Sequence, residues 1–249
     1  MNDFLPVSRG DMEKRGWDSL DFLYIVGEAY VDHPSFGHAI ISRVLEKHGY
    51  KVGIVALPDW RKKDDFMRMG RPRLGVLVSA GNIDSMVNHY TAGKKRRSDD
   101  AYAPGNKAGQ RPDRATIVYC NRIREIFGDI PLLIGGVEAS LRRFAHYDYW
   151  DDKVRRSMLF DSRADILMYG MGEKQIVILA DRLNGGESAR SITDVPGTCY
   201  IADEAGIRDI KNSVMIPSYE ECADDKEKYA RSCAKQYYEQ NPFTGKMVI

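Results

Sequence analysis

The stretch Asp21-Phe-Leu-Tyr-Ile-Val-Gly27 is short, continuous in apolar and aromatic residues, and ends in a glycine. These features are typical of a β-strand that is buried on both faces of a sheet. Between Gly37 and His48 the apolar residues recur at helical spacing, and Lys51-Val-Gly-Ile-Val-Ala-Leu57 then repeats the strand pattern. The order strand, helix, strand predicts two parallel strands joined by a right-handed crossover.

The same alternation continues along the chain. Further strands are predicted over residues 73–79, 130–134, 164–169 and 195–202, and further helices over residues 84–90, 113–127, 137–144 and 174–183. We therefore expect an α/β domain over residues 21–205, with a doubly wound, mostly parallel sheet of Rossmann-like or flavodoxin-like type. Residues 1–20 are polar and irregular in pattern, and we expect them to form a lead-in segment.

Two segments interrupt the alternation. Residues 91–114 have no apolar periodicity, and a loop of that length inside a compact domain is usually functional or disordered. Ser218-Tyr-Glu-Glu221 matches a capping box, which predicts the start of a charged helix that runs to about Gln240. We expect residues 206–249 to form a connector toward a further domain.

Composition limits the classes of partner. The chain has 249 residues, a formal net charge of +1 and 43% hydrophobic residues, so we expect a buried core and no overall attraction to nucleic acid. The basic run of residues 94–97 is followed at once by Asp99 and Asp100, which also disfavours a nucleic-acid partner. The sequence contains no apolar run of about 18 residues and no export signal, so we predict a cytoplasmic protein without a membrane span. Its four cysteines form no C-x-x-C or C-x-x-x-C-x-x-C motif, and no metal site is predicted.

Candidate cofactor-binding residues lie in four loops that follow predicted strands, because ligands of open parallel sheets bind beyond the carboxyl ends of the strands. Glycine lets a ligand approach the backbone closely, and a helix start offers free N–H groups. The candidates are Asp32, His33, Ser35 and Gly37 after the first strand, Ser79 and Gly81 after the third, Gly135, Gly136 and Glu138 after the fourth, and Gly170, Gly172 and Glu173 after the fifth.

Each loop also has a purely structural explanation. Ser35 suits the cap of the helix that follows it, the paired glycines after the fourth strand suit a tight turn, and Glu173 suits the first turn of a helix. Gly170 and Gly172 lack the third glycine of the dinucleotide-binding fingerprint, which excludes that fingerprint. We assign no catalytic residue, because the sequence contains no motif of a known catalytic class.

Six longer sequence words, taken in order, carry a resemblance to a known family. They are GEAYVDHPSFG (27–37), SDDAY (98–102), RPDRA (111–115), GGVEASLRR (135–143), HYDYW (146–150) and YGMGE (169–173). Together they resemble the amino-terminal region of the YgiQ family of radical S-adenosylmethionine proteins. The resemblance covers nearly the whole chain, as far as Asn241-Pro-Phe-Thr-Gly245.

The resemblance implies an accessory role. Proteins of this family place this region ahead of a radical S-adenosylmethionine barrel, whose C-x-x-x-C-x-x-C motif holds a four-iron, four-sulfur cluster that binds S-adenosylmethionine. The present sequence lacks that motif and cannot assemble the cluster from its own residues. We therefore expect an accessory amino-terminal domain of a radical S-adenosylmethionine enzyme of unknown substrate, with the downstream barrel as its partner in cis. Whether this chain has an activity of its own stays open.

A looser similarity connects the loops with cobalamin-binding domains, which often carry D-x-H-x-x-G after the first strand. Asp32 and Gly37 keep that spacing, but Pro34 stands at the histidine position and His33 is displaced by one residue. A bound corrinoid without that histidine ligand stays open. The alternatives are a stand-alone module that binds a corrinoid or a nucleotide, and an interaction domain whose loops only pack on partners. Binding of a small-molecule ligand by the isolated chain separates these two.

Overall fold

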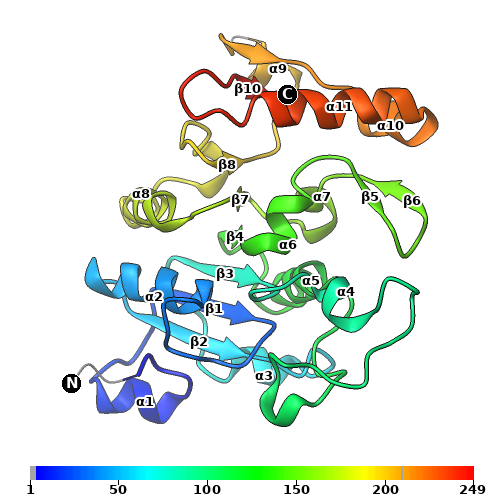
Figure 1. Cartoon of the computed structure of the whole chain (residues 1–249). Helices are drawn as coiled ribbons and strands as arrows, with labels where there is room; N and C mark the ends of the chain where they lie inside the picture. The colour runs from blue at the N-terminus through cyan, green and yellow to red at the C-terminus, as the bar shows by residue number, and fades with distance from the viewer. Residues whose placement is uncertain (1–3, 209) are drawn as a thin grey trace. The chain divides into compact units, whose positions relative to one another are not determined.

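A computed structural model describes residues 4–208 and 210–249 of the chain. The chain divides into two compact units, of which the first comprises residues 1–143 and 158–200 and the second comprises residues 144–157 and 201–249 (Figure 1). Residues 1–3 of the expected lead-in lie outside the described residues.

The first unit is built on a six-stranded sheet. In spatial order its strands are β2 (Val52–Ala56), β1 (Phe22–Val26), β3 (Gly75–Ser79), β4 (Leu132–Ile134), β7 (Ile166–Met168) and β8 (Thr198–Cys199). The first five are parallel to one another, and β8 runs antiparallel to β7. The predicted mostly parallel α/β sheet is therefore confirmed, although the late strand is shorter than the range 195–202.

Alternate residues of β1 face two separate apolar cores. Leu23 and Ile25 belong to the core that is closed by α3 (Lys63–Met67), α5 (Ala115–Phe127) and α7 (Met158–Ser162). Phe22, Tyr24 and Val26 belong to the core that is closed by α2 (Gly37–Lys47) and α8 (Glu173–Asn184) (Figure 1). Because both faces of β1 are covered, its sequence is a continuous apolar run without polar alternation.

The chain changes direction across the sheet at β1. Its first connection leads from β1 to β2 on one side, and later strands are added on the other side beginning with β3. The loops that leave the carboxyl ends of β1 and β3 therefore diverge. This is the switch point at which doubly wound sheets form a crevice.

The lead-in segment is more regular than its sequence predicts. Residues 9–14 form α1 (Arg9–Lys14), whose first turn is capped by the Ser8 side chain. Leu5 is buried, and the Pro6 carbonyl accepts a hydrogen bond of 2.8 Å from the Ile54 amide of β2. The irregular sequence pattern gave no indication of this helix, because a few isolated apolar residues suffice to anchor a short capped helix.

The long segment of residues 91–114 follows α4 (Ser85–His89) and contains a buried ion pair between two of its own residues. Arg111 donates to both carboxylate oxygens of Asp100, at 3.3 and 3.2 Å, and to the Ala80 carbonyl at 3.1 Å. A short 3-10 turn, η1 (Pro104–Asn106), lies within the segment. The ion pair therefore braces the loop internally, and the hydrogen bond from Arg111 to the Ala80 carbonyl joins the loop to the residue that follows β3, which its sequence pattern could not indicate.

The second unit contains a hairpin and a helix pair. The hairpin joins β5 (His146–Asp148) to β6 (Lys153–Arg155), and the remaining elements are α9 (Glu204–Ile207), β9 (Ser213–Val214), α10 (Tyr219–Asp224), α11 (Lys226–Tyr238) and β10 (Met247–Val248). The capping box at Ser218 and Glu221 is confirmed. The single helix predicted as far as about Gln240 was wrong, because Asp225 is extended and its carboxylate caps the start of α11.

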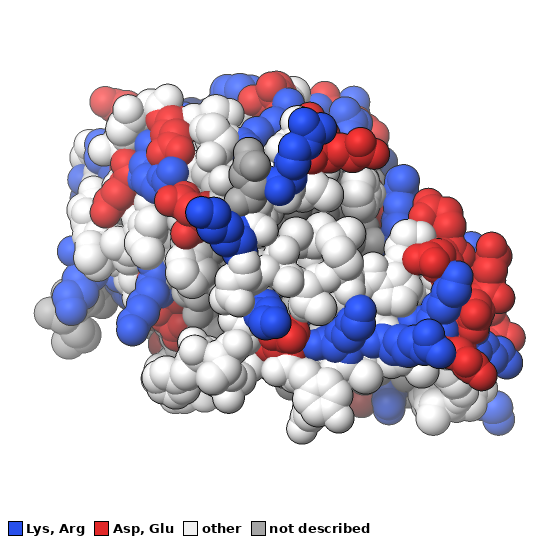
Figure 2. All heavy atoms as spheres, turned by 90° about the horizontal axis from the view of Figure 1, so that it is seen from above, with Lys and Arg blue, Asp and Glu red and all other residues white. Residues whose placement is uncertain are grey.

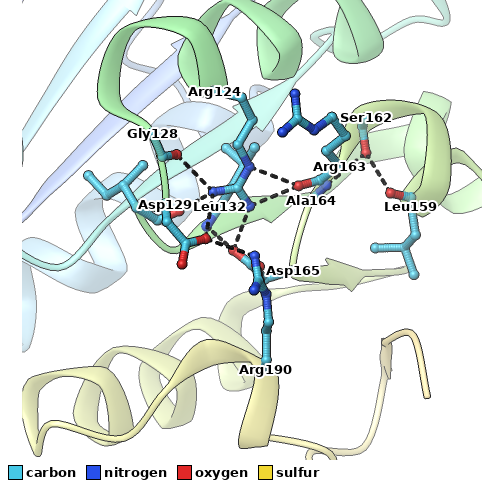
Figure 3. A network of polar contacts seen from close by, with 11 residues as sticks. Arg124, Gly128, Asp129, Leu132, Leu159, Ser162, Arg163, Ala164, Asp165 and Arg190 are labelled. Carbon is cyan, nitrogen blue, oxygen red and sulfur yellow. Dashed lines mark hydrogen bonds and ion pairs between the residues drawn. The ribbon is translucent and has the colours of Figure 1, made fainter. Parts of the chain in front are cut away.

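A buried arginine organises the amino ends of β4 and β7 (Figure 3). Arg124 of α5 donates to the Ile130 carbonyl at 2.7 Å and to the Arg163 carbonyl at 2.8 and 2.9 Å. It also donates to the Asp165 carboxylate at 2.8 Å, and both side chains are almost completely buried. One guanidinium group thereby satisfies loop carbonyls that neither the sheet nor the helix pairs.

We predict that Arg124→Lys lowers the free energy of unfolding by about 2–4 kcal/mol, because an ammonium group cannot reproduce the planar fork of donors. The measurement is equilibrium unfolding in urea. Arg190→Lys is the matched control, since Arg190 contacts the same Asp165 from an exposed position and its change should stay below about 0.5 kcal/mol. Equal losses in the two variants would contradict the account.

Candidate functional site

A cleft of about 340 Å³ opens at the carboxyl ends of β1, β3, β4 and β7, on the sheet face that α2 and α8 cover. Nine of the twelve predicted site residues line it. They are Ser35, Gly37, Ser79, Gly81, Gly135, Gly136, Gly170, Gly172 and Glu173. The structure therefore brings together the four loops that the strand order placed at this edge, and a binding role for these residues stays a prediction.

The walls of the cleft are mainly apolar. Ile40 and Ile41 of α2 form one side, and Leu77, Leu133 and Met168 form the sheet side. Glu173 is the only carboxylate among the described residues that line the cleft. Such walls favour a largely uncharged ligand over a multiply charged one.

The polar groups of the cleft gather at the ends of β1 and β3. The Tyr24 hydroxyl donates to Ser79 Oγ at 3.3 Å, and burial raises the pKa of Tyr24 to about 12. Next to Tyr24 lies His38, in the first turn of α2, with the two rings edge-on and their centroids 6.4 Å apart. Tyr24, His38 and Ser79 all line the cleft.

Beneath this group lies the completely buried carboxylate of Glu28, the second residue after β1. Its Oε1 is 3.1 Å from His38 Nδ1, and its Oε2 accepts a hydrogen bond of 2.8 Å from the Asn82 amide. Gly81 makes room for it, because a Cβ at this position would meet Glu28 Oε2 at 2.6 Å and the φ of Gly81 is +106°. Glu28 thus joins the loop after β1, the loop after β3 and the start of α2.

Asn82 fastens the same loops from the outside. Its side chain donates to the Ser35 carbonyl at 2.9 Å and accepts from the Gly37 amide at 3.4 Å. The helix that begins here, α2, has Phe36 as its N-cap and no side-chain cap. The structural explanation of Ser35 as the capping residue was therefore wrong, because α2 begins one residue later, with Phe36 as its N-cap.

Three helix starts at the cleft lack a side-chain cap. They belong to α2, to α6 (Gly136–Leu141) with Gly135 as its N-cap, and to α8 with Gly172 as its N-cap. Their backbone N–H groups could donate hydrogen bonds to a polar group of a bound molecule. Within the described part of the chain no group of three or more His, Cys, Asp or Glu residues is arranged to hold a metal ion.

Three predicted site residues do not line the cleft. Asp32 pairs with Arg43, whose guanidinium lowers the pKa of that carboxyl below its usual value. His33 Nδ1 accepts from the Ser35 amide at 3.1 Å. Glu138 is buried, and its carboxylate accepts from the Ser85 and Thr116 amides at 2.8 and 3.0 Å, which holds α4 and α5 together. A ligand role for these residues remains a prediction, but each has a structural partner.

Four residues of the site were missed by sequence reasoning, namely Tyr24, Glu28, His38 and Asn82. Tyr24 is hidden in the apolar run of β1, and Glu28 follows a strand without belonging to any known motif. One sequence feature could have pointed to Glu28 and His38. Each directly follows a glycine, Gly27 or Gly37, at one end of the loop after β1.

Electrostatics and hydropathy add two observations. Basic and acidic side chains lie interspersed on the face shown in Figure 2, which gives no support to a nucleic-acid partner there. Among the helices that the structure describes, none is long and apolar enough to cross a membrane.

Comparison with known proteins identifies relatives along the whole chain. A family model described as Radical SAM N-terminal matches residues 4–249. A protein named UPF0313 from Clostridium botulinum (strain ATCC 19397 / Type A) is 58% identical over 247 residues, covering 99% of this chain and 38% of that protein. A UPF0313 protein from Clostridium perfringens (strain ATCC 13124) is 56% identical over 248 residues, covering 100% of this chain and 37% of that protein. The chain thus spans less than two fifths of the length of these curated relatives.

One solved structure is also similar. It is the radical S-adenosylmethionine methyltransferase TsrM from Kitasatospora setae, with tryptophan substrate and a SAM analog bound. The match has a TM-score of 0.48 and 18% sequence identity, and it covers 74% of this chain and 29% of that chain.

We predict that the glycines of the cleft differ in their tolerance of a side chain. Gly81→Ala should lower the free energy of unfolding by about 1–3 kcal/mol, because its φ is positive and the new Cβ would displace Glu28. Gly135→Ala should change it by less than about 0.5 kcal/mol, because Gly135 is extended and its nearest neighbour would be 3.5 Å away. Urea unfolding of both variants is the measurement. A Gly81→Ala protein as stable as the parent would show that Glu28 is not held as described.

Proposed function

The chain belongs to the Radical SAM N-terminal family, and on that premise we propose that it is the accessory amino-terminal part of a radical S-adenosylmethionine enzyme. Its cleft would hold a cofactor or a part of the substrate. A radical S-adenosylmethionine domain, carried farther along the same polypeptide as the length of the relatives suggests, would perform the chemistry.

The observation that carries this proposal is a cleft that is already formed in the chain alone. Four loops meet at the switch point of the sheet, and glycines stand where larger side chains would fill the space. The volume of about 340 Å³ lies at the lower end of the range of about 300–1,000 Å³ for small-molecule sites. It suits a nucleoside-sized group or one part of a larger cofactor.

The residues of this chain do not fit an iron–sulfur cluster. Burial raises the pKa of the Cys120 thiol, and it raises that of Cys199 to about 12, so neither presents a thiolate at neutral pH. No described cysteine belongs to a group of three or more metal-ligating residues. In the proposed enzyme the cluster and S-adenosylmethionine would therefore be bound by residues of the downstream domain, and the present chain contributes the cleft.

For a corrinoid or a nucleotide, the two ligands left open by the sequence, the fit is partial. The uncapped starts of α2 and α8 could bind polar edges of either molecule, and the apolar walls could pack on a flat ring. Pro34 lines the cleft at the position where cobalamin-binding domains often carry a histidine. A corrinoid would accordingly be held without a ligand from that position.

A second role is suggested by the end of the second unit. Tyr237 and Tyr238 of α11 are more than two-thirds exposed, and Phe243 is 94% exposed. Exposed aromatic side chains close together commonly mark contact surfaces. We propose that residues 206–249 contact the downstream domain as a connector, which also accommodates the interaction-domain alternative.

The test of the proposal is equilibrium dialysis of the 249-residue chain with hydroxocobalamin and, separately, with adenosine. We expect saturable binding of at least one probe. Gly135→Val should weaken this binding by about tenfold or more, because it adds bulk at the cleft wall, while the thermal midpoint of unfolding stays within about 2 °C of the parent.

Gly10→Val is the matched control, because Gly10 lies in α1 and does not line the cleft. It should leave binding unchanged. Binding that survives Gly135→Val would mean that this glycine does not line the ligand site, and no binding of either probe would favour the interaction domain. A thermal midpoint of unfolding that falls sharply in Gly135→Val would mean that Gly135 is required for packing.

A further inference from the structure

We propose that His38 is the recognition residue of the cleft, and that its Nε2 accepts a hydrogen bond from an N–H or O–H group of an uncharged, mainly apolar ligand. Glu28 is the positioning residue that sets this polarity. The inference rests on the proposed role of the cleft as a ligand site and names the class of ligand. It concerns atoms that no other part of the binding argument uses.

The first observation is an unpaired polar atom. His38 is 2% exposed, and its Nε2 has no hydrogen-bond partner among the residues that the structure describes. Buried polar groups without a partner are rare in native proteins because they lose hydration and gain nothing in return. His38 is also one of the residues that line the cleft.

The second observation favours a proton on Nδ1 of His38. Glu28 Oε2 accepts from the Asn82 amide, and Glu28 Oε1 faces His38 Nδ1 at 3.1 Å. An ionised carboxylate accepts hydrogen bonds and donates none, so Nδ1 must be the donor in this pair. In the neutral imidazole Nε2 then carries a lone pair, and the cleft presents an acceptor.

The third observation is that the imidazole ring cannot turn away. Its centroid lies 6.4 Å from that of Tyr24, 5.8 Å from that of Tyr30 and 5.7 Å from that of Phe36. Rings packed on several sides hold the histidine in one orientation and exclude water from its surroundings. A hydrogen bond formed there is stronger than one formed in water.

The remaining walls decide the charge of the ligand. Most of the other lining side chains are apolar, and Glu173 would repel an anion. A cation would lose its hydration without gaining a second carboxylate, because Glu28 is already shared between His38 and Asn82. An uncharged molecule with an apolar body and one donor group matches the cleft best.

The alternative is that His38 serves only to tie Glu28 to α2. His38→Asn separates the two roles, because the asparagine amide can still donate near the position of Nδ1 but leaves no acceptor at the position of Nε2. Glu28→Gln gives a second, independent variant. Its amide oxygen can still accept from Asn82, so its NH₂ group must face Nδ1, which places the proton on Nε2 and turns the acceptor into a donor.

The experiment uses the full 249-residue chain with ¹⁵N-labelled histidine and two probes of nearly the same shape, 2-naphthol and 2-methoxynaphthalene. Only 2-naphthol carries a donor. We expect the NMR spectrum of the free chain to show an unprotonated Nε2 at His38. We expect 2-naphthol to bind about fivefold to tenfold more tightly than the ether, which corresponds to the free energy of one hydrogen bond. We also expect 2-naphthol to shift the Nε2 resonance of His38.

In His38→Asn the two probes should bind equally, and in Glu28→Gln the preference for 2-naphthol should disappear or reverse. A proton on Nε2 in the free parent chain, or equal binding of both probes to it, would overturn the inference. Equal binding that Gly135→Val abolishes would still support the cleft as a ligand site. Absence of binding by either probe counts against His38 as an acceptor, and dialysis with hydroxocobalamin and adenosine then decides separately on the proposed function.

Discussion

The buried carboxylate of Glu28 is the interaction on which the cleft depends. The sheet reverses its order between β1 and β3, so the loops that leave these strands diverge and need a bond to hold them in register. Glu28 joins the two loops, because one oxygen of its carboxylate accepts a hydrogen bond from the Asn82 amide and its other oxygen faces His38 Nδ1. Gly81 has no side chain because this carboxylate occupies the space. The geometry of the cleft is therefore set by a residue that does not line it.

The buried arginine network and the cleft lie at opposite edges of the same sheet. Arg124 and Asp165 close the amino ends of β4 and β7, where loop carbonyls would otherwise be unsatisfied (Figure 3). The carboxyl ends of the same strands carry glycines and an open space. This division is typical of α/β sheets, in which loops at one edge can change with the ligand while the other edge maintains the fold.

The sheet was predictable from the sequence because strands buried on both faces have an unmistakable pattern, as in residues 21–27. The loops of the cleft were also predictable, because the carboxyl ends of parallel strands lie at one edge of a sheet and bring the loops that follow them together. The directions of the side chains could not be predicted from the sequence. Asp32 turns to Arg43, Glu138 turns to two helix starts, and Glu28 and His38 acquire meaning only through their contact across ten residues. Pairings between distant polar groups leave no periodic signal in a sequence.

The account depends most on the claim that the cleft is filled by a small molecule and not by protein. The most direct measurement is a crystal structure of a full-length relative, purified from its own organism and containing the downstream domain. The account predicts density for a small molecule within hydrogen-bond distance of the nitrogen equivalent to His38 Nε2. A cleft filled by side chains of the downstream domain would contradict it and would make this chain an interaction domain.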